Sequence, residues 1–254
     1  MSTVLSAPVA CEFAKMRRLR VTPVVAVMII GVVALTSREL TTPGFFDSLD
    51  DPAGGPWLRL LASLAFAVPL VSPILVAVLA SRQVDLEHQG NGWLFAHTAG
   101  LPAGKLCRTK FLATGAILVA ATLLQSTLVI GVGTLAGITG QFPAGQWSAY
   151  TVSAVVVNLV LLALHLLLAA RIENQLIGLG ISVLGVFLAA SGSGLPAWVA
   201  HLSPWTYYAL ATPADYSGDD LVPIAPWHLS IVALGVVGAA AFLLLTRRVD
   251  RQEV

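Results

Sequence analysis

The residues that come nearest to a recognised chemical motif lie in a polar stretch, Ser81–Lys110, between two long apolar runs. Within it, Gly100-Leu101-Pro102-Ala103-Gly104-Lys105-Leu106 approximates the phosphate-binding loop of nucleotide-binding proteins. That loop needs about four residues between its glycines, a Ser or Thr after its Lys, and a preceding strand. Here three residues separate the glycines and Leu106 follows Lys105. We therefore expect this chain to bind no nucleotide.

The remaining polar side chains form no pattern typical of a catalytic or metal site. The histidines are scattered, and no group of His, Cys, Asp and Glu has the spacing of metal ligands. No Ser/His/Asp order and no carboxylate pair in an apolar run indicates catalysis. The sequence therefore predicts no metal, no catalytic residue and no cofactor on this chain, and argues against a membrane enzyme acting on lipid.

The composition is that of a polytopic membrane protein. Of its 254 residues, 57% are hydrophobic and only 11% are charged, whereas soluble domains average about 45–50% apolar and about 25% charged residues. The basic residues are few and flank apolar runs, so nothing indicates nucleic-acid binding. We expect residues 1–254 to form a single transmembrane domain.

Six apolar stretches predict an all-α fold with six transmembrane helices, since about 17–25 apolar residues span a bilayer. Pro69 and Pro73 predict a kink in the second span, and the Gly- and Ser-rich run after Ala190 ends the short fifth span. The predicted spans are Val21–Ser37, Leu58–Ala80, Phe111–Ile138, Ala149–Ala170, Leu176–Ala190 and His228–Thr246.

The charge distribution predicts the orientation of these spans. If the N-terminus is cytoplasmic, twelve of the fourteen Lys and Arg residues fall in inner segments. The outer loops instead carry seven acidic residues. Because Lys and Arg concentrate on the cytoplasmic side of membrane proteins, we expect both termini in the cytoplasm.

Residues 1–20 have the pattern of an amphipathic helix lying in the membrane interface. Leu5, Val9, Phe13 and Met16 recur at helical spacing on one face. Such a helix places its basic residues near the lipid headgroups, and a partly ordered tail is the alternative. In this helix three charged residues lie away from the apolar face: Glu12, Lys15 and Arg18. Arg17 is adjacent to Arg18 in the sequence.

An aromatic segment, residues 191–227, is expected on the outer side of the membrane. Its Trp and Tyr residues favour the membrane interface. We expect short re-entrant or interfacial helices there, with an ordinary aromatic belt as the alternative.

Few polar residues interrupt the predicted spans. Gln125 lies in the third span, and Asn158 and His165 share one face of the fourth. Polar residues inside a membrane face the bundle interior or a cavity. They could line a translocation path, or they could hydrogen-bond between helices, which is the commoner use.

The loop at residues 81–110 itself suggests a docking element. A charged run follows the second span and contains Arg82, Asp85 and Glu87. The next residues, Gly90 to Gly92, form a turn. Trp93-Leu94-Phe95-Ala96-His97-Thr98-Ala99 can form one or two helical turns before Leu101-Pro102. A short apolar helix on a charged stalk suits insertion into a groove on a partner protein.

These residues resemble a family motif. Glu87, Gly90, Asn91, Gly92, Trp93, Leu101, Pro102, Lys105 and Lys110 are similar to the coupling-helix pattern of type-two-class ABC exporter permeases. Asn91 departs from it, since the family often has Gly-Thr-Trp there. Glu12, Phe13, Lys15, Arg17 and Arg18 resemble the family's N-terminal connecting helix.

The resemblance implies a transport subunit in a bacterial cell membrane. Its partners would be two ABC ATPase subunits, which hold ATP and Mg, and a second permease chain, identical or related. The closest branch exports peptide antibiotics or gives lantibiotic and bacteriocin immunity, so the expected cargo is an amphiphilic compound. The resemblance also implies a small second coupling element near Arg171 and Glu173, with a solvated charged turn as the alternative. The alternative is a non-transporting resistance or scaffold protein that binds a peptide at its outer face.

Overall fold

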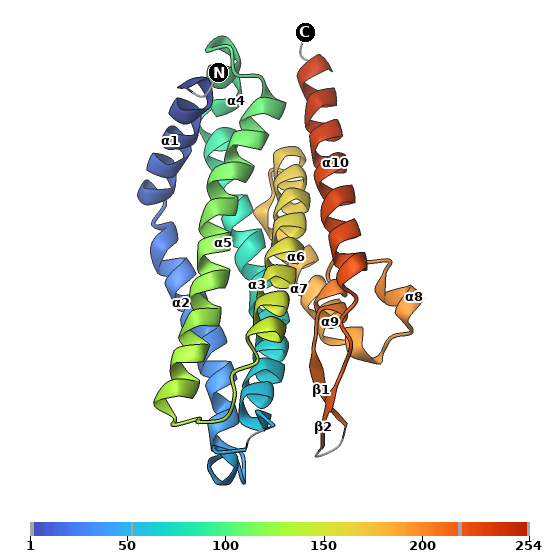
Figure 1. The fold of residues 1–254 in the computed structure, drawn as a ribbon. Coiled ribbons are helices and arrows are strands. Elements are labelled where there is room, and N and C mark those ends of the chain that lie inside the picture. The colour runs from blue at the N-terminus through green and yellow to red at the C-terminus, as the bar shows by residue number, and fades with distance from the viewer. Residues whose placement is uncertain (1–2, 52, 218–219, 253–254) are drawn as a thin grey trace.

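The computed structural model describes residues 3–51, 53–217 and 220–252, and they form a bundle of long helices (Figure 1). A first helix, α1 (Thr3–Arg18), precedes the bundle. The chain turns at Arg20, whose φ of 52° is left-handed, and then enters the first bundle helix. The bundle helices are α2 (Val21–Ser37), α3 (Gly55–Gln89), α5 (Ala103–Leu135), α6 (Ala144–Arg171), α7 (Gln175–Ala190) and α10 (His228–Gln252).

The six expected spans correspond to these six helices. Within the described residues, five of these helices are long and apolar enough to cross a membrane, and the sixth, α7, is a shorter apolar helix. The helix α3 lies at the centre, packed against α2, α5, α6 and α7. Between Leu60 and Ala80 its residues are apolar apart from Ser63 and Ser72, as expected for a helix with several neighbours, and it contributes the buried residues Leu60, Leu61 and Leu64.

Two helices extend beyond the predicted spans, because charged residues mark the edge of an apolar run and not the end of a helix. The helix α3 continues through Ser81–Gln89 and stops at Gly90, and α5 begins at Ala103 instead of Phe111. The loop expected over residues 81–110 is therefore mostly helical. The part between the two long helices is Gly90–Pro102, with α4 (Gly92–Thr98) inside it. The helix α3 is also continuous through Pro69 and Pro73.

The two ends of the bundle differ in what they carry. One end holds α1, α4, the turn between α6 and α7, and the last turns of α10 (Figure 1); it is called the α4 end below. The opposite end holds the short 3-10 helices η1 (Arg38–Thr41) and η2 (Phe46–Ser48) and a β-hairpin; it is called the hairpin end.

The segment 191–227 confirms the expectation of short helices and adds a hairpin that the sequence did not predict. It contains η3 (Gly192–Gly194), α8 (Ala197–Ala200) and α9 (Tyr207–Leu210). Strands β1 (Ala214–Ser217) and β2 (Asp220–Pro223) pair antiparallel, with Tyr216 opposite Leu221. The Leu5 side chain and Asp219 lie outside the described residues.

Part of this segment packs against the bundle beyond the end of α7, which is a short helix. Sixteen residues rise about 24 Å at about 1.5 Å per residue, less than the roughly 30 Å hydrocarbon core of a bilayer. Beyond α7, Tyr208 reaches Asn158 in the middle of α6. Trp205 lies against His165, with ring centroids 6.2 Å apart.

Candidate functional site: the α4 helix and its supports

The helix α4 is a separate short element because its two ends are set by residues suited to left-handed backbone. Asn91, which caps its start, has φ 50°, and Asn tolerates this conformation better than most residues. Gly100 has φ +75° just after its end. There the Gly100 amide donates to the His97 carbonyl and the Leu101 amide donates to the Ala96 carbonyl. These are the two bonds of a Schellman motif, a common helix termination.

Gly92 allows α4 to lie directly against the end of α3. A Cβ atom at residue 92 would collide with the Glu87 carboxylate and with its Cα. The Gly at this position therefore reflects close approach and not a need for flexible backbone.

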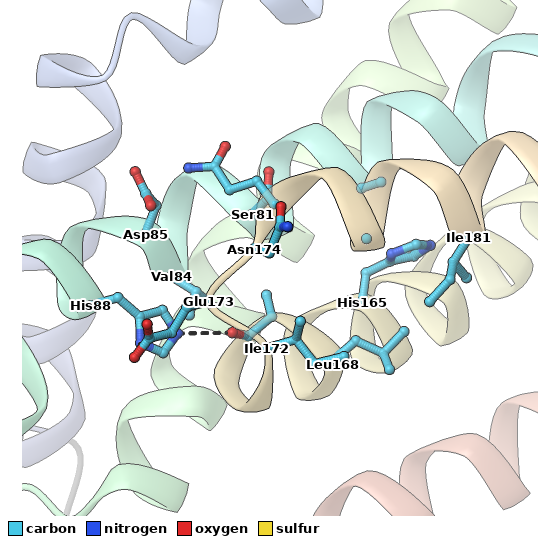
Figure 2. Close-up of a pocket in the computed structure, with 14 residues that line it drawn as sticks. Ser81, Val84, Asp85, His88, His165, Leu168, Ile172, Glu173, Asn174 and Ile181 are labelled. Carbon is cyan, nitrogen blue, oxygen red and sulfur yellow. Dashed lines mark hydrogen bonds and ion pairs between the residues drawn. The ribbon is translucent and has the colours of Figure 1, made fainter.

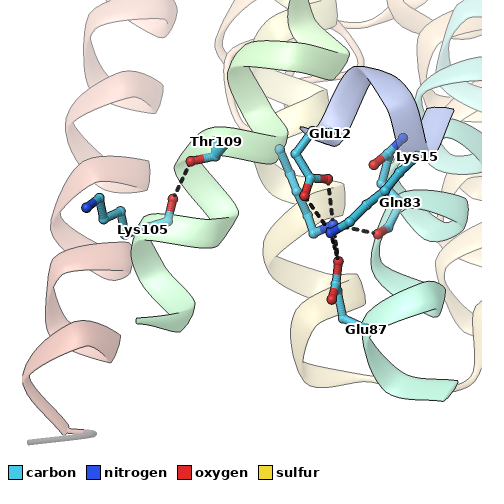
Figure 3. A network of polar contacts seen from close by, with 7 residues as sticks. Glu12, Lys15, Gln83, Glu87, Lys105 and Thr109 are labelled. Carbon is cyan, nitrogen blue, oxygen red and sulfur yellow. Dashed lines mark hydrogen bonds and ion pairs between the residues drawn. The ribbon is translucent and has the colours of Figure 1, made fainter. Parts of the chain in front are cut away.

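Glu87 belongs to a buried ionic cluster that joins three helices (Figure 3). The Lys110 ammonium on α5 donates to Glu12 Oε2 of α1 at 2.8 Å, to Glu87 Oε1 of α3 at 2.7 Å and to the Gln83 carbonyl at 2.9 Å. Lys15 on α1 donates to Glu12 Oε1 and Glu87 Oε1, both at 2.7 Å. We call Glu12, Lys15, Glu87 and Lys110 the four-charge cluster.

The four-charge cluster is neutral as a unit, and three of its side chains are almost completely buried, while the Lys15 side chain is 30% exposed. Lys110 is fully buried, and Glu12 and Glu87 are 2% and 4% exposed. Burial by itself lowers the pKa of Lys15, but its hydrogen bonds to Glu12 and Glu87 outweigh burial and raise that pKa above the ordinary 10.5. A buried pair costs desolvation free energy, so it stabilises the fold only while each charge keeps its partner. The cluster therefore makes α1, α3 and α5 depend on one another at the α4 end.

The helix α1 differs from the expected interfacial helix on one face. Glu12, predicted to point away from the apolar face, is buried because Lys110 supplies an opposite charge inside the protein. Of the residues predicted on its apolar face, Met16 is buried against the bundle and Phe13 is 41% exposed. Arg17 and Arg18 are exposed, where basic residues of an interfacial helix are expected.

The outward face of α4 is apolar. Leu94 is 62% exposed and Phe95 is 68% exposed, and His97 is also exposed. Trp93 is half-buried and packs on His88 of α3, with ring centroids 5.9 Å apart. An exposed apolar pair outside the spanning segments is typical of a protein contact surface.

The chain after α4 is fastened to the end of α10. Leu101 and Pro102 are half-buried, and Pro102 caps α5. The Lys105 amide donates to Asp250 Oδ1 at 3.0 Å, and Arg108 Nη2 donates to Asp250 Oδ2 at 2.8 Å. Sequence reasoning missed Asp250 because nothing in its neighbourhood signals a partner 142 residues away.

A small pocket lies between the ends of α3, α6 and α7 (Figure 2). His88 Nε2 lies 2.9 Å from the Ala169 carbonyl, and His88 Nδ1 lies 4.0 Å from Glu173 Oε1. The pocket holds about 20 Å³, which is room for about one water molecule. His88 thus touches both α4, through Trp93, and the α6–α7 turn where a second coupling element is expected.

The three polar residues predicted inside the spans have different surroundings. Asn158 accepts a hydrogen bond from the Tyr208 hydroxyl at 2.5 Å and donates to Thr122 Oγ1 at 3.0 Å. Gln125 is buried in α5, and His165 lines the pocket of Figure 2. The structure does not gather these three residues into one cavity, and their place on a translocation path stays a prediction. Sequence reasoning missed Tyr208, because it lies 50 residues from Asn158.

The described residues contain no group of three or more His, Cys, Asp or Glu that could hold a metal ion. The arrangement offers contact surfaces and mechanical links instead of reactive groups.

Comparison with known families agrees with this geometry. Residues 9–189, well over half of the chain, match the family model described as ABC-2 family transporter protein. The match runs from α1 through α4 into α7, so it includes the four-charge cluster and the exposed face of α4. No curated protein sequence matches the chain. The chain therefore belongs to the ABC-2 transporter family, as a multi-pass membrane permease that associates with an ABC ATPase component.

Proposed function

We propose that this chain is the permease of an ABC exporter and that α4 is the helix that docks on the ATPase subunit. The observation that carries the proposal is the exposed pair Leu94 and Phe95 on a helix braced by the four-charge cluster. The apolar pair supplies contact area for a groove on the partner. ATP and Mg²⁺ would be bound by the ATPase.

Movement of α4 would reach the membrane through the four-charge cluster. Glu87 lies against Gly92 at the start of α4 and shares Lys110 with Glu12. A displacement of α4 therefore bears on α1, α3 and α5 together. In this scheme Glu87 contributes to coupling mainly by holding α4 in place. The residues that contact the ATPase directly are Leu94, Phe95 and His97.

Other parts of the proposal rest on the family resemblance and on the charge distribution. The α4 end would face the cytoplasm, with both termini on that side. The assembly would contain two ATPase subunits and two permease chains, identical or related. The cargo would be an amphiphilic compound such as a peptide antibiotic, either exported or extracted from the membrane.

The docking role can be tested with the double variant Leu94→Ser/Phe95→Ser. The chain would be co-expressed with candidate ABC ATPases of the same genome, and co-purification and ATPase stimulation would be measured. We expect at least a tenfold loss of complex, because anchor residues at interface centres contribute about 2 kcal/mol or more. Phe46→Ser is the matched control, since Phe46 is 59% exposed at the hairpin end.

Two outcomes would count against the proposal. A double variant that binds and stimulates the ATPase like the wild type would remove α4 as the docking helix. Protection against a peptide antibiotic that persists with a catalytically dead ATPase would favour a non-transporting resistance protein.

A further inference from the structure

An apolar groove runs along the outside of α5, α6 and α10 and plays no part in the docking scheme. Its volume is about 420 Å³, within the range of about 300–1,000 Å³ typical of small-molecule sites. Its lining is almost entirely carbon and includes Leu112 of α5, Val160 of α6 and Ala239 of α10. The groove therefore suits a flexible hydrocarbon chain.

The groove has one charged lining residue, Arg108. Arg108 precedes the apolar run that begins at Phe111, so it lies near the membrane edge at the α4 end. Its Nη2 is paired with Asp250, but its Nη1 is buried and finds no acceptor among the described residues. Buried N–H groups of this kind normally have a partner, so the site is short of one acceptor.

Further positive charge surrounds this end of the groove. Arg247 follows the lining residue Leu243 by one helical turn on α10, and Arg247 and Arg248 are both exposed. Residues four apart share a helix face, so Arg247 continues the groove wall toward the headgroups. An occupant with an anionic group at the α4 end and an apolar tail would meet both features.

Because lipid tails are as apolar as the groove, hydrocarbon contact alone gives little preference for any lipid. A guanidinium recognises phosphate strongly, and basic pockets between transmembrane helices on the cytoplasmic side bind anionic headgroups. We propose that this groove is a binding site for an anionic phospholipid, with an acyl chain along α5, α6 and α10 and the phosphate on Arg108 Nη1. In the orientation proposed above, the lipid belongs to the cytoplasmic leaflet.

The test is native mass spectrometry of the purified full-length chain equilibrated with equal amounts of phosphatidylglycerol and phosphatidylcholine carrying the same acyl chains. We expect about a fivefold excess of bound phosphatidylglycerol, the effect of about one cation near a membrane surface. Arg108→Gln should remove most of this excess. Asp250→Asn, which frees Arg108 from its partner, should keep or raise it.

These two variants separate lipid binding from a merely structural ion pair, because loss of the pair alone would make them behave alike. Ala239→Phe should fill the groove and lower retention of both lipids. Ala240→Phe is its control, since Ala240 is exposed and does not line the groove. This second pair still tests the site if Arg108→Gln fails to fold.

Equal retention of the two lipids by the wild type would overturn the proposal. So would equal shifts in Arg108→Gln and Asp250→Asn, or equal retention by the two Phe variants.

Discussion

Each end of the bundle has an ionic cluster, and the two are built differently. At the α4 end, the fully buried Lys110 joins α1, α3 and α5 through bonds of 2.7–2.9 Å. At the hairpin end, Arg59 Nε lies 3.5 Å from Glu39 Oε1, and the Arg59 side chain is 24% exposed. Glu39 also accepts a hydrogen bond from the Tyr216 hydroxyl at 2.9 Å.

The difference indicates where the molecule needs rigidity. A cluster with three buried charges and short bonds holds its helices in one arrangement, because any separation leaves a buried charge unpaired. Glu39 is also buried, but its contact with Arg59 is longer, and it keeps Tyr216 and Thr42 as hydrogen-bond donors when Arg59 moves away. The α4 end is thus suited to transmit a displacement, while the hairpin end can rearrange as the helices move.

Removal of Lys110 is expected to have the largest effect on stability and gives the strongest test of this difference between the two ends. Lys110→Met leaves Glu12 and Glu87 buried with Lys15 as their shared partner, and removing one member of a buried ion pair costs about 3–5 kcal/mol. Arg59→Met at the hairpin end should cost less, about 1–2 kcal/mol, because the buried Glu39 loses one 3.5 Å contact but keeps Tyr216 and Thr42 as donors. The measurement is the apparent free energy of unfolding in detergent for both variants.

A rescue experiment sharpens the result. Glu12→Gln in the Lys110→Met background restores neutrality, with Lys15 facing Glu87, and should recover part of the loss. Similar losses for Lys110→Met and Arg59→Met would mean that the two clusters do not differ as described.

A smaller effect is expected for the neutral hydrogen bonds between the two ends. Tyr208→Phe removes the hydroxyl that donates to Asn158. Side-chain hydrogen bonds between membrane helices average about 0.6 kcal/mol and reach about 1.7 kcal/mol. We expect a loss in that range with transport kinetics unchanged, measured by unfolding and by efflux from vesicles. A large change in substrate selectivity would instead place Asn158 on the translocation path.

Much of the architecture could be predicted from the sequence because it depends on local composition. Apolar runs and the Lys and Arg distribution predicted six helices, and the turn residues around Asn91 and Gly100 predicted α4. The helix boundaries could not be predicted in the same way. Ser81–Gln89 is helical although it is polar, since leaving the membrane does not end a helix and Gly90 does.

The candidate site was only half predictable for a related reason. Glu87 and Lys110 could be singled out by their place in a motif, but their pairing depends on how α1 packs. The contact between Lys110 and Glu12 joins residues 98 apart. Similarly, the Tyr216 contact with Glu39 spans 177 residues and requires a hairpin that the aromatic composition did not indicate.

The smallest effect concerns protonation at the hairpin end. Burial, with the neighbouring Glu39, raises the pKa of Tyr216 from 10.0 to about 12. A raised pKa means that the protonated phenol favours the folded state. Its contribution is therefore complete below about pH 10 and is lost as pH rises toward about 12.

The measurement is the phenolate absorbance difference between the wild type and Tyr216→Phe, titrated from pH 9 to 12.5. We expect a midpoint near 12 that moves only part of the way toward 10 in Glu39→Gln, because burial still raises the pKa of Tyr216 after the accepting carboxylate is removed. A midpoint near 10 in the wild type would show that the Tyr216 hydroxyl of the hairpin does not contact Glu39. The hairpin end would then be looser than the 2.9 Å contact indicates, and the contrast with the four-charge cluster would be greater.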